Sequence, residues 1–316
     1  MLGDSHKSLS NAILKAVAYS DIFDHPLSAP DIHRYLVAFR LSFEELESAL
    51  NDERSIVRIG GLFILPGREE ILPIRRQREN RSKKLMPQAL QIGRILGALP
   101  FIRMVALTGS LAVMNVSKSD DFDFMLVTVP GRVWTARAFA LLLNRIAKLF
   151  GHTICPNLIV SESALEWPLQ DLYSARELCQ MVPITGMDVY RNLIRLNSWA
   201  ADFLPNAFLE SNSLLFESPH ENSPSSRWAI GFQKLFEFLL CGKLGDRFEN
   251  WERDRKIRLF SKQEGFGEET IFNAEVCQGN FHHHRKWTHE AFQKRLNDIS
   301  NASHHPTGEA LGMRAA

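Results

Sequence analysis

The sequence predicts a mixed α+β fold, with a small N-terminal module, a central sheet with helices and a helical C-terminal region. The first seventy residues combine helix-type apolar spacing, two helix caps and a hairpin signal. Two apolar, strand-like runs then flank residues 108–121, and apolar residues with helical spacing return after residue 188. This distribution of strand and helix signals indicates the α+β class.

Size and composition are those of an ordinary globular protein. The chain has 316 residues, 45% of them hydrophobic and 23% charged, and a net charge of +1, so no overall field favours nucleic acid or membrane. The four cysteines are widely spaced and form no CxxC pair. The first ten residues are polar, and no run approaches the roughly 18 apolar residues of a membrane span. We expect a cytoplasmic protein with reduced thiols and no membrane partner.

The first seventy residues predict three helices followed by a two-stranded hairpin. Apolar residues with helical spacing mark the first helix. Ser28 begins the second helix, and Ser42 with Glu45 forms a capping box for the third. The pair Gly60-Gly61 between two strand-like segments is typical of a tight hairpin. This order of elements is that of a winged helix, and we assign residues 1–73 to a winged-helix-like module.

Winged-helix modules suggest binding to duplex DNA through the third helix, and the charges of this module oppose that role. Residues 1–73 contain seven Lys or Arg and eleven Asp or Glu, a net charge of −4. The acids on and just after the third helix are Glu44, Glu45, Glu47, Asp52 and Glu53. They would face DNA phosphates, whose attraction to basic groups supplies most non-specific affinity. We therefore expect a structural or protein-docking module and do not expect duplex DNA as a partner.

The charge balance inverts directly after this module. Residues 74–84 read IRRQRENRSKK, with six basic side chains and one acid. Such a run is ordinarily the solvated face of a helix; the alternative is that it lies near a functional site and attracts a triphosphate or an RNA backbone. The helix continues to Pro100 and leads into a strand, so the domain that we assign to residues 74–187 begins with it.

The most informative stretch is Met104–Val129, which reads MVALTGSLAVMNVSKSDDFDFMLVTV. A first apolar run ends in Thr108-Gly109-Ser110, and after ten further residues a second apolar run contains Asp121 and Asp123. Residues two apart on a strand point to the same face, so the two carboxylates lie side by side while Phe122 and its alternating neighbours face a core. The Gly-Ser pair opens a short helix and offers backbone N–H groups and a hydroxyl to an anion.

Together these features predict a phosphate cradle that faces a divalent cation. The acids Asp120, Asp121 and Asp123 would repel each other inside a strand unless a cation lay beside them. The alternative is a solvated acidic turn between two strands.

This combination resembles the nucleotidyltransferase superfamily, which has the fold of DNA polymerase β. The superfamily's signature is an apolar residue, Gly, Gly or Ser, a short spacer, and then Asp-apolar-Asp/Glu-apolar; here Thr108 takes the first position. The resemblance implies a polymerase-β-like mixed sheet with helices and a Mg²⁺-dependent transfer of NMP from an NTP. It implies that Thr108, Gly109 and Ser110 bind the nucleotide's phosphates and that Asp121 and Asp123 bind two Mg²⁺ ions.

Further segments resemble one branch of that superfamily, the bacterial nucleotidyltransferase-domain proteins with an N-terminal winged-helix module. These segments lie at residues 107–112, 121–127, 131–137 and 172–178, and the resemblance covers roughly residues 10–205. It implies the fold and a nucleotide ligand. Members of the branch are largely uncharacterised, so the resemblance does not give an acceptor.

The superfamily usually takes a third carboxylate from the strand after the connecting helix, and here that strand, residues 153–160, contains no acid. Asn157 stands where the acid is expected, and the resemblance implies that the branch shares this asparagine. Its amide oxygen can ligate Mg²⁺ but brings no charge and accepts no proton. Glu162 could help only if Pro156 or a bulge shifted the register. Either the enzyme uses Asp121 and Asp123 with a substitute base, or the chain binds nucleotide and transfers slowly or not at all.

Other polar residues allow more than one interpretation. Trp134 and Arg137 begin the helix after the carboxylate strand. Trp134 either packs in the core or lies under a base or sugar, and Arg137 either pairs with an acid or contacts the triphosphate. The run His282-His283-His284 has no acid or cysteine at ligand spacing, so we do not expect it to bind a metal.

Helical periodicity dominates the rest of the chain, and we assign residues 188–300 to a helical C-terminal region. Residues 210–226 are rich in Ser, Asn and Pro and predict a linker, and residues 301–316 predict a disordered tail. The helices expected here cover residues 188–204, 227–240, 246–260 and 285–299.

The sequence therefore predicts a Mg²⁺-dependent nucleotidyltransferase that moves NMP from an NTP to an unidentified acceptor hydroxyl on a small molecule, a protein or an RNA end. The alternative is a catalytically weak or inactive nucleotide-binding or interaction protein on the same fold. A DNA-binding regulator is the least favoured interpretation, because of the acidic third helix.

Overall fold

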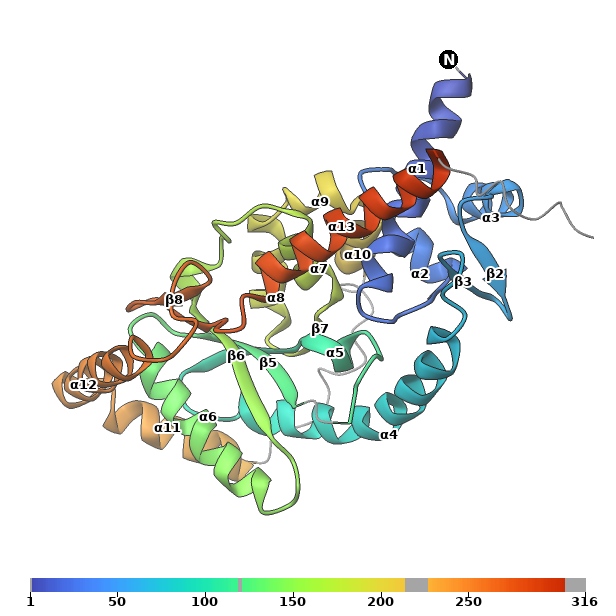
Figure 1. The fold of residues 1–316 in the computed structure, drawn as a ribbon. Helices are drawn as coiled ribbons and strands as arrows, with labels where there is room; N and C mark the ends of the chain where they lie inside the picture. Colours follow the sequence, from blue (N-terminus) through green and yellow to red (C-terminus); the bar gives the residue numbers. More distant parts are fainter. Residues whose placement is uncertain (1, 119–120, 214–226, 305–316) are drawn as a thin grey trace, which may run out of the picture.

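Within residues 2–118, 121–213 and 227–304, which the computed structural model describes, the fold is built around a six-stranded mixed sheet (Figure 1). The strand order is β7-β4-β5-β6-β9-β8, and β5 with β6 is the parallel pair among antiparallel neighbours. A parallel pair requires a crossover, and helix α6 (Val133–Lys148) provides it. The strands are β4 (Ile102–Leu107), β5 (Phe122–Thr128), β6 (Ile154–Ser161), β7 (Val182–Thr185), β8 (Thr270–Phe272) and β9 (Val276–Gly279).

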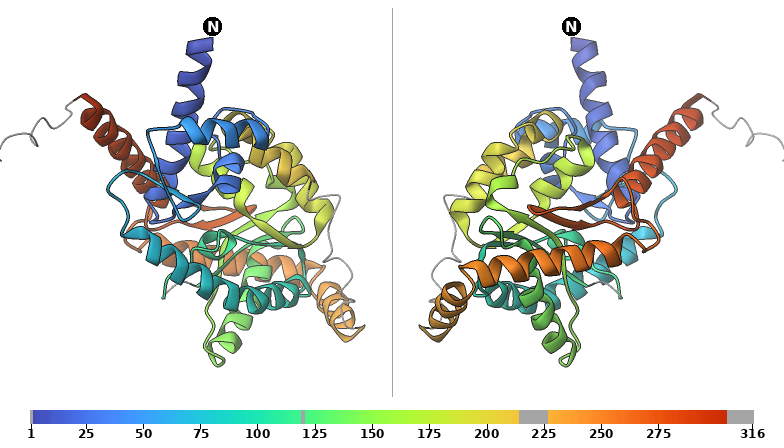
Figure 2. Two further views of the ribbon diagram at one scale, coloured as in Figure 1. Left: turned by 90° about the vertical axis from the view of Figure 1, so that its right-hand side faces the viewer. Right: turned by 90° about the vertical axis from the view of Figure 1, so that its left-hand side faces the viewer.

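Helices cover both faces of this sheet, in layers that Figure 2 shows edge-on. Phe122, Phe124 and Leu126 pack against α4 (Ile71–Gly97) and α6. Met125 and Val127, on the opposite face of the same strand, pack against helices that follow β6. The predicted core-facing side of β5 is thus confirmed. The helices of the second face are α7 (Leu172–Gln180), α8 (Met187–Leu196), α9 (Ala200–Phe203) and α10 (Pro205–Ser213).

The N-terminal segment forms three helices and a small antiparallel sheet, with strand order β1-β3-β2. Ser42 forms the predicted capping box with Glu45, and Ser28 caps α2 as predicted, in a capping box with Asp31. Gly60 and Gly61, with φ of 58° and 83°, make the predicted hairpin turn. The elements are α1 (Leu2–Asp21), β1 (Leu27–Ser28), α2 (Ala29–Arg34), α3 (Phe43–Asp52), β2 (Val57–Ile59) and β3 (Leu62–Ile64).

This N-terminal module is attached to the rest of the chain at several places, of which two involve the second helical layer and the C-terminal helix. The guanidinium of Arg34 on α2 donates to the carbonyl of Cys179 on α7 (2.8 Å) and pairs with Glu210 on α10 (3.3 Å). Phe292 on α13 (His284–His304) enters the core of the module, where its ring meets Tyr19 edge-on at 5.5 Å. The C-terminal helix therefore completes the core of the first seventy residues.

The region 188–300 is not purely helical, and the prediction of a helical C-terminal region is wrong on this point. The helix expected at 188–204 is divided into α8 and α9, and the other three expected helices are present as α11 (Arg227–Leu239), α12 (Lys243–Phe260) and α13. Between α12 and α13, however, β8 and β9 form a hairpin, and β9 pairs with β6 at the edge of the central sheet. These strands have three and four residues, too few for a period-two pattern to show in the sequence.

Two other boundaries differ from the prediction. The predicted linker overlaps α10, which extends to Ser213, and residues 214–226 lie outside the described residues. The predicted disordered tail overlaps α13, which extends to His304, and residues 305–316 also lie outside them. In the described part of the chain, no helix combines the length and the apolar character that crossing a membrane requires.

Two helices begin on carboxylates supplied by distant segments. Glu249 of α12 accepts hydrogen bonds from the backbone N–H groups of Trp134 (2.9 Å) and Thr135 (2.7 Å) at the start of α6. Glu269 accepts from the N–H groups of Arg285 (3.0 Å) and Lys286 (2.7 Å) at the start of α13. These bonds satisfy N–H groups that a helix leaves without internal partners, so the position of each helix depends on a remote part of the chain.

Candidate functional site

The end of β4 lies directly against the first carboxylate strand. The backbone N–H of Thr108 donates to the carbonyl of Asp123 (2.9 Å), and Gly109, which opens the short helix α5 (Gly109–Ala112), has a φ of +67°. A Cβ at position 109 would lie 2.4 Å from Oδ2 of Asp123. Gly109 is thus required twice, by its left-handed backbone and by the carboxylate that packs on its Cα. The fold brings together the two halves of the sequence motif.

Asp121 and Asp123 act on one thiol. Asp121 is exposed and immediately precedes β5, and Asp123 pairs in register with Cys155 of β6. The pKa of Cys155 is raised to about 12, first by burial, then by the charge of Asp123 and its hydrogen bond from the thiol, and then by the charge of Asp121. Cys155 is therefore a neutral thiol near neutral pH. Asp120 lies outside the described residues.

Asn157 is the extra residue of a β-bulge. Phe124 pairs with Pro156 and Met125 pairs with Leu158, which leaves Asn157 without a partner in the β5–β6 register. Its exposed side chain lines the same cavity as Met125 and Leu158.

Glu162 does not replace the missing third acid. Thr128 pairs with Ser161, so Glu162 follows the opposite end of β6 from Cys155, the partner of Asp123. On β5, the five residues from Asp123 to Thr128 separate these two levels, which is about 17 Å at roughly 3.3 Å per residue. The bulge therefore does not restore a site of three acids with Glu162.

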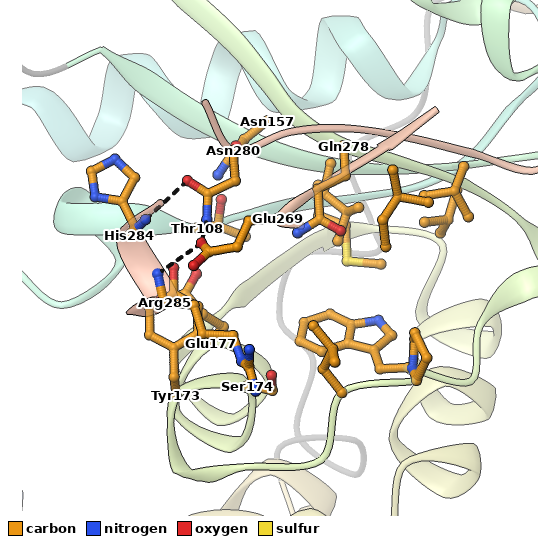
Figure 3. Close-up of a pocket in the computed structure, with 18 of the residues that line it drawn as sticks. Thr108, Asn157, Tyr173, Ser174, Glu177, Glu269, Gln278, Asn280, His284 and Arg285 are labelled. Atoms are coloured by element: carbon orange, nitrogen blue, oxygen red, sulfur yellow. Dashed lines mark hydrogen bonds between the residues drawn. The ribbon is translucent and has the colours of Figure 1, made fainter. Parts of the chain in front are cut away.

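A cavity of about 350 Å³ opens beside the carboxylate strand. The sheet, α7 and the segment from Glu268 to Arg285 form its walls, so residues far apart in the sequence enclose it (Figure 3). Its lining is mainly apolar, with a limited set of polar groups, which is the usual composition of a small-molecule site. The polar groups labelled in Figure 3 include Thr108, Asn157, Glu177, Glu269, Gln278 and Asn280.

Glu177 is the acid in this wall that is electrostatically linked to the carboxylate strand. Desolvation, and then the negative charge of Asp123, raise its pKa to about 7, against the opposing effects of Arg176 and of a hydrogen bond from Gln180 (2.6 Å). Sequence reasoning missed Glu177. A signal existed, because it is an acid on a nine-residue helix whose other positions from Ser174 to Cys179 are buried.

Two buried polar atoms of the cavity wall have no hydrogen-bond partner among the described residues. They are Oγ1 of Thr108, a residue that is 7% exposed, and Nε1 of Trp167. Buried polar atoms are almost always hydrogen-bonded, so both point to a polar ligand or ordered water in the cavity. Glu269, in contrast, is satisfied, because it binds the start of α13 and the amide of Asn280.

Arg137 and Trp134 lie in the other helical layer, away from this cavity. The guanidinium of Arg137 lies 5.1 Å from the centre of the Phe260 ring, and it lowers the pKa of Cys277, which burial raises to about 11. Trp134 is fully buried, and its indole donates to the carbonyl of Asn273 (2.8 Å). The structure thus gives Trp134 a packing role, while the charge of Arg137 acts to lower the pKa of Cys155, the register partner of Asp123.

The oxygen donors at the carboxylate strand are of the kind that Mg²⁺ prefers. Asp121 and Asp123 offer carboxylates and Asn157 an amide oxygen, so two of the three donors carry charge. Across residues 2–118, 121–213 and 227–304, no group of three or more His, Cys, Asp or Glu side chains could hold a metal ion, and this includes His282-His283-His284. The set fits a metal that keeps several waters and binds together with a substrate phosphate.

Comparisons with protein-family models, with curated proteins and with solved structures find no match for this chain. Its chemistry is therefore inferred from the residues around Gly109 and Asp123.

Proposed function

We propose that the chain is a Mg²⁺-dependent nucleotidyltransferase that transfers NMP from an NTP to an acceptor hydroxyl. The observation that carries this proposal is the contact between Gly109 and Asp123, which leaves no room for a side chain at position 109. A backbone pressed against a carboxylate allows phosphate oxygens and a cation to be held within one small volume. A solvated acidic turn would not need this contact.

In this proposal the backbone and hydroxyl of Gly109-Ser110 hold the terminal phosphates, and Thr108 offers its buried hydroxyl to the ligand. Asp121, Asp123 and Asn157 are the residues that would hold magnesium. Bound Mg²⁺ supplies positive charge that neutralises the phosphates and polarises the α-phosphorus. The acceptor oxygen forms a bond to the α-phosphorus, the bond from that phosphorus to the β-phosphate oxygen breaks, and pyrophosphate leaves.

The acceptor hydroxyl must lose a proton, and Asn157 cannot take it. We assign this role to Glu177, because its carboxylate lines the cavity and lies within the electrostatic influence of Asp123. An acid with a pKa near the working pH suits a general base. The cavity then holds the acceptor.

The N-terminal module has the helix order and hairpin of a winged helix, and we propose that it is a docking module. Its third helix exposes Glu44, Glu45 and Glu47, which would face DNA phosphates. Its second helix is already occupied, because Arg34 binds α7 and α10. The central mixed sheet agrees with the polymerase-β-like sheet that the sequence resemblance implies.

The test uses the purified full chain, Mg²⁺ and each α-labelled NTP in turn, with detection of pyrophosphate and of labelled product. Asp121→Asn and Asp123→Asn should each reduce transfer by orders of magnitude and leave the thermal unfolding temperature in EDTA unchanged or higher, because each removes like-charge repulsion. Asn157→Asp should tighten Mg²⁺ binding by adding a third charge. If Mg²⁺-dependent nucleotide binding survives both Asp→Asn changes, the site is elsewhere.

A nucleotide-binding protein without efficient transfer is the second candidate. The observation that favours it is the neutral Asn157 at the bulge, with Glu162 about 17 Å further along the sheet. The same assay separates the two functions, since this candidate predicts Mg²⁺-dependent nucleotide binding without pyrophosphate release.

A further inference from the structure

The basic run at the start of α4 divides into sets with different surroundings. One set faces the N-terminal module, where Arg75 pairs with Asp31 (3.6 Å) and Arg78 pairs with Asp24 (3.5 Å). These arginines attach the module to α4, so their charge is already used within the fold.

A second set lies on the outer surface of α4. Lys83 pairs with Glu79 on the same helix (2.6 Å), and Arg76 lies beside Gly60 at the hairpin turn. Neither lines the cavity beside Glu177 or the cavity described next.

The third set, Arg81 and Lys84, lines a separate cavity of about 600 Å³ together with Lys118 and His152. None of the described residues that line it is an acid, and none of its three cations, Arg81, Lys84 and Lys118, forms an ion pair with a described residue. Converging positive charges without a carboxylate among them would repel one another, so the arrangement is suited to an anion.

This second cavity, called the groove from here on, reaches the carboxylate strand. Phe122, which lies between Asp121 and Asp123, forms part of its wall, and its ring stacks on that of His152 at 5.3 Å. Phe122 points away from the face that Asp123 occupies, so the groove and the cavity beside Glu177 lie on opposite sides of β5. A chain of phosphates in the groove would therefore lead to Asp121 from the side opposite the acceptor cavity.

We propose that this groove binds a phosphate chain, either the oligophosphate of a nucleotide or the backbone of a short single strand of nucleic acid. Three cations on two separate segments, with amide groups from Gln77 and Asn80 beside them, match a row of phosphates better than a single small anion. Binding here needs neither Mg²⁺ nor the carboxylates of β5. It therefore stands even if the proposed transfer reaction fails.

The test measures binding of a fluorescein-labelled eight-nucleotide RNA to the full chain in EDTA by fluorescence anisotropy. The double variant Arg81→Gln/Lys84→Gln should weaken binding at least about tenfold, and the matched control Arg76→Gln/Lys83→Gln should not, although it removes the same charge from the same helix. The unaltered chain, with three phosphate contacts, should lose about 20-fold in affinity between 50 and 200 mM salt. The Arg81→Gln/Lys84→Gln variant, with one remaining contact, should lose about threefold. Circular dichroism confirms that both variants are folded.

Competition by unlabelled tripolyphosphate distinguishes the two sources of the phosphate chain. If tripolyphosphate displaces the labelled RNA at the concentrations at which tripolyphosphate itself saturates the chain, the natural ligand is a nucleotide's oligophosphate. If only unlabelled RNA strand displaces it, the ligand is nucleic acid. Equal losses in the two double variants would overturn the proposal, because they would show a general attraction to α4. The proposal would also be overturned if neither the labelled RNA nor tripolyphosphate bound with a Kd below about 1 mM at 50 mM salt, because even non-specific binding is normally tighter than that.

Discussion

Replacing Gly109 with alanine should destabilise the fold by an amount that the structure divides into two parts. The first part is backbone strain, because φ is +67° and a Cβ in the left-handed region costs about 1–2 kcal/mol. The second is steric, because the new Cβ would lie 2.4 Å from Oδ2, 3.1 Å from Cγ and 3.2 Å from Cβ of Asp123. Moving that side chain out of its rotamer costs about 1–3 kcal/mol.

Gly131 provides a matched control for the strain. Its φ is +69°, and nothing lies within 4 Å of a Cβ placed there. Gly131→Ala should therefore lower the free energy of unfolding only by the backbone strain. Each Gly→Ala change also stiffens the unfolded chain, which offsets the strain by the same amount in both variants. The difference between the two variants, about 1–3 kcal/mol, isolates the contact with Asp123.

Urea unfolding followed by circular dichroism measures both costs, and a double-mutant cycle locates their cause. Asp123→Ala removes the carboxylate and leaves only its Cβ at 3.2 Å, so Gly109→Ala in that background should cost less than in the unaltered chain and little more than Gly131→Ala. If Gly109→Ala costs no more than Gly131→Ala in the unaltered chain, the contact does not constrain position 109. Additive effects of the changes at positions 109 and 123 would contradict the reasoning equally.

Three further predictions concern buried groups. The pKa of Glu177 is about 7 in the folded chain, above the ordinary value of 4.5, so its contribution to stability is fully present below pH 4.5 and is lost as pH rises through 7. Urea unfolding at pH 5 and pH 8 should therefore show that Glu177→Gln gains stability relative to the unaltered chain by up to about 3 kcal/mol at pH 8, while NMP transfer falls. Thr108→Val should leave the free energy of unfolding unchanged or raise it by up to about 1 kcal/mol, since the hydroxyl has no partner among the described residues, and should weaken nucleotide binding measured by calorimetry. Glu249→Ala should cost about 2–4 kcal/mol in urea unfolding, because it removes the charged acceptor at the start of α6; a cost below about 1 kcal/mol would mean that water replaces it.

Local signals predicted local structure well. Ser28 and Ser42 form their capping boxes because a cap needs only residues three apart. Gly60-Gly61 makes the hairpin turn for the same reason. The alternation that turns Phe122 and Phe124 into the core required only the period of a strand.

Features that depend on distant pairing could not be predicted. The three residues of β8 have no periodic signature and become a strand by pairing with β9, which itself pairs with β6. The bulge at Asn157 is set by the register of β6 against β5, and Glu177 reaches the cavity because α7 packs on the sheet. The sequence motif therefore located one wall of the candidate site and missed the walls that α7 and the residues after 267 supply.

The pairing of β9 with β6 and the insertion of Phe292 beside Tyr19 have a consequence for how the chain is made. Segments near the N-terminus commonly fold first during synthesis, but here β6 keeps an open edge until residues 276–279 have emerged from the ribosome. The core around Tyr19 likewise stays incomplete until Phe292 follows. An open edge strand is a template for pairing with other chains, so the nascent protein is most prone to aggregation late in translation, just before its last strand is complete.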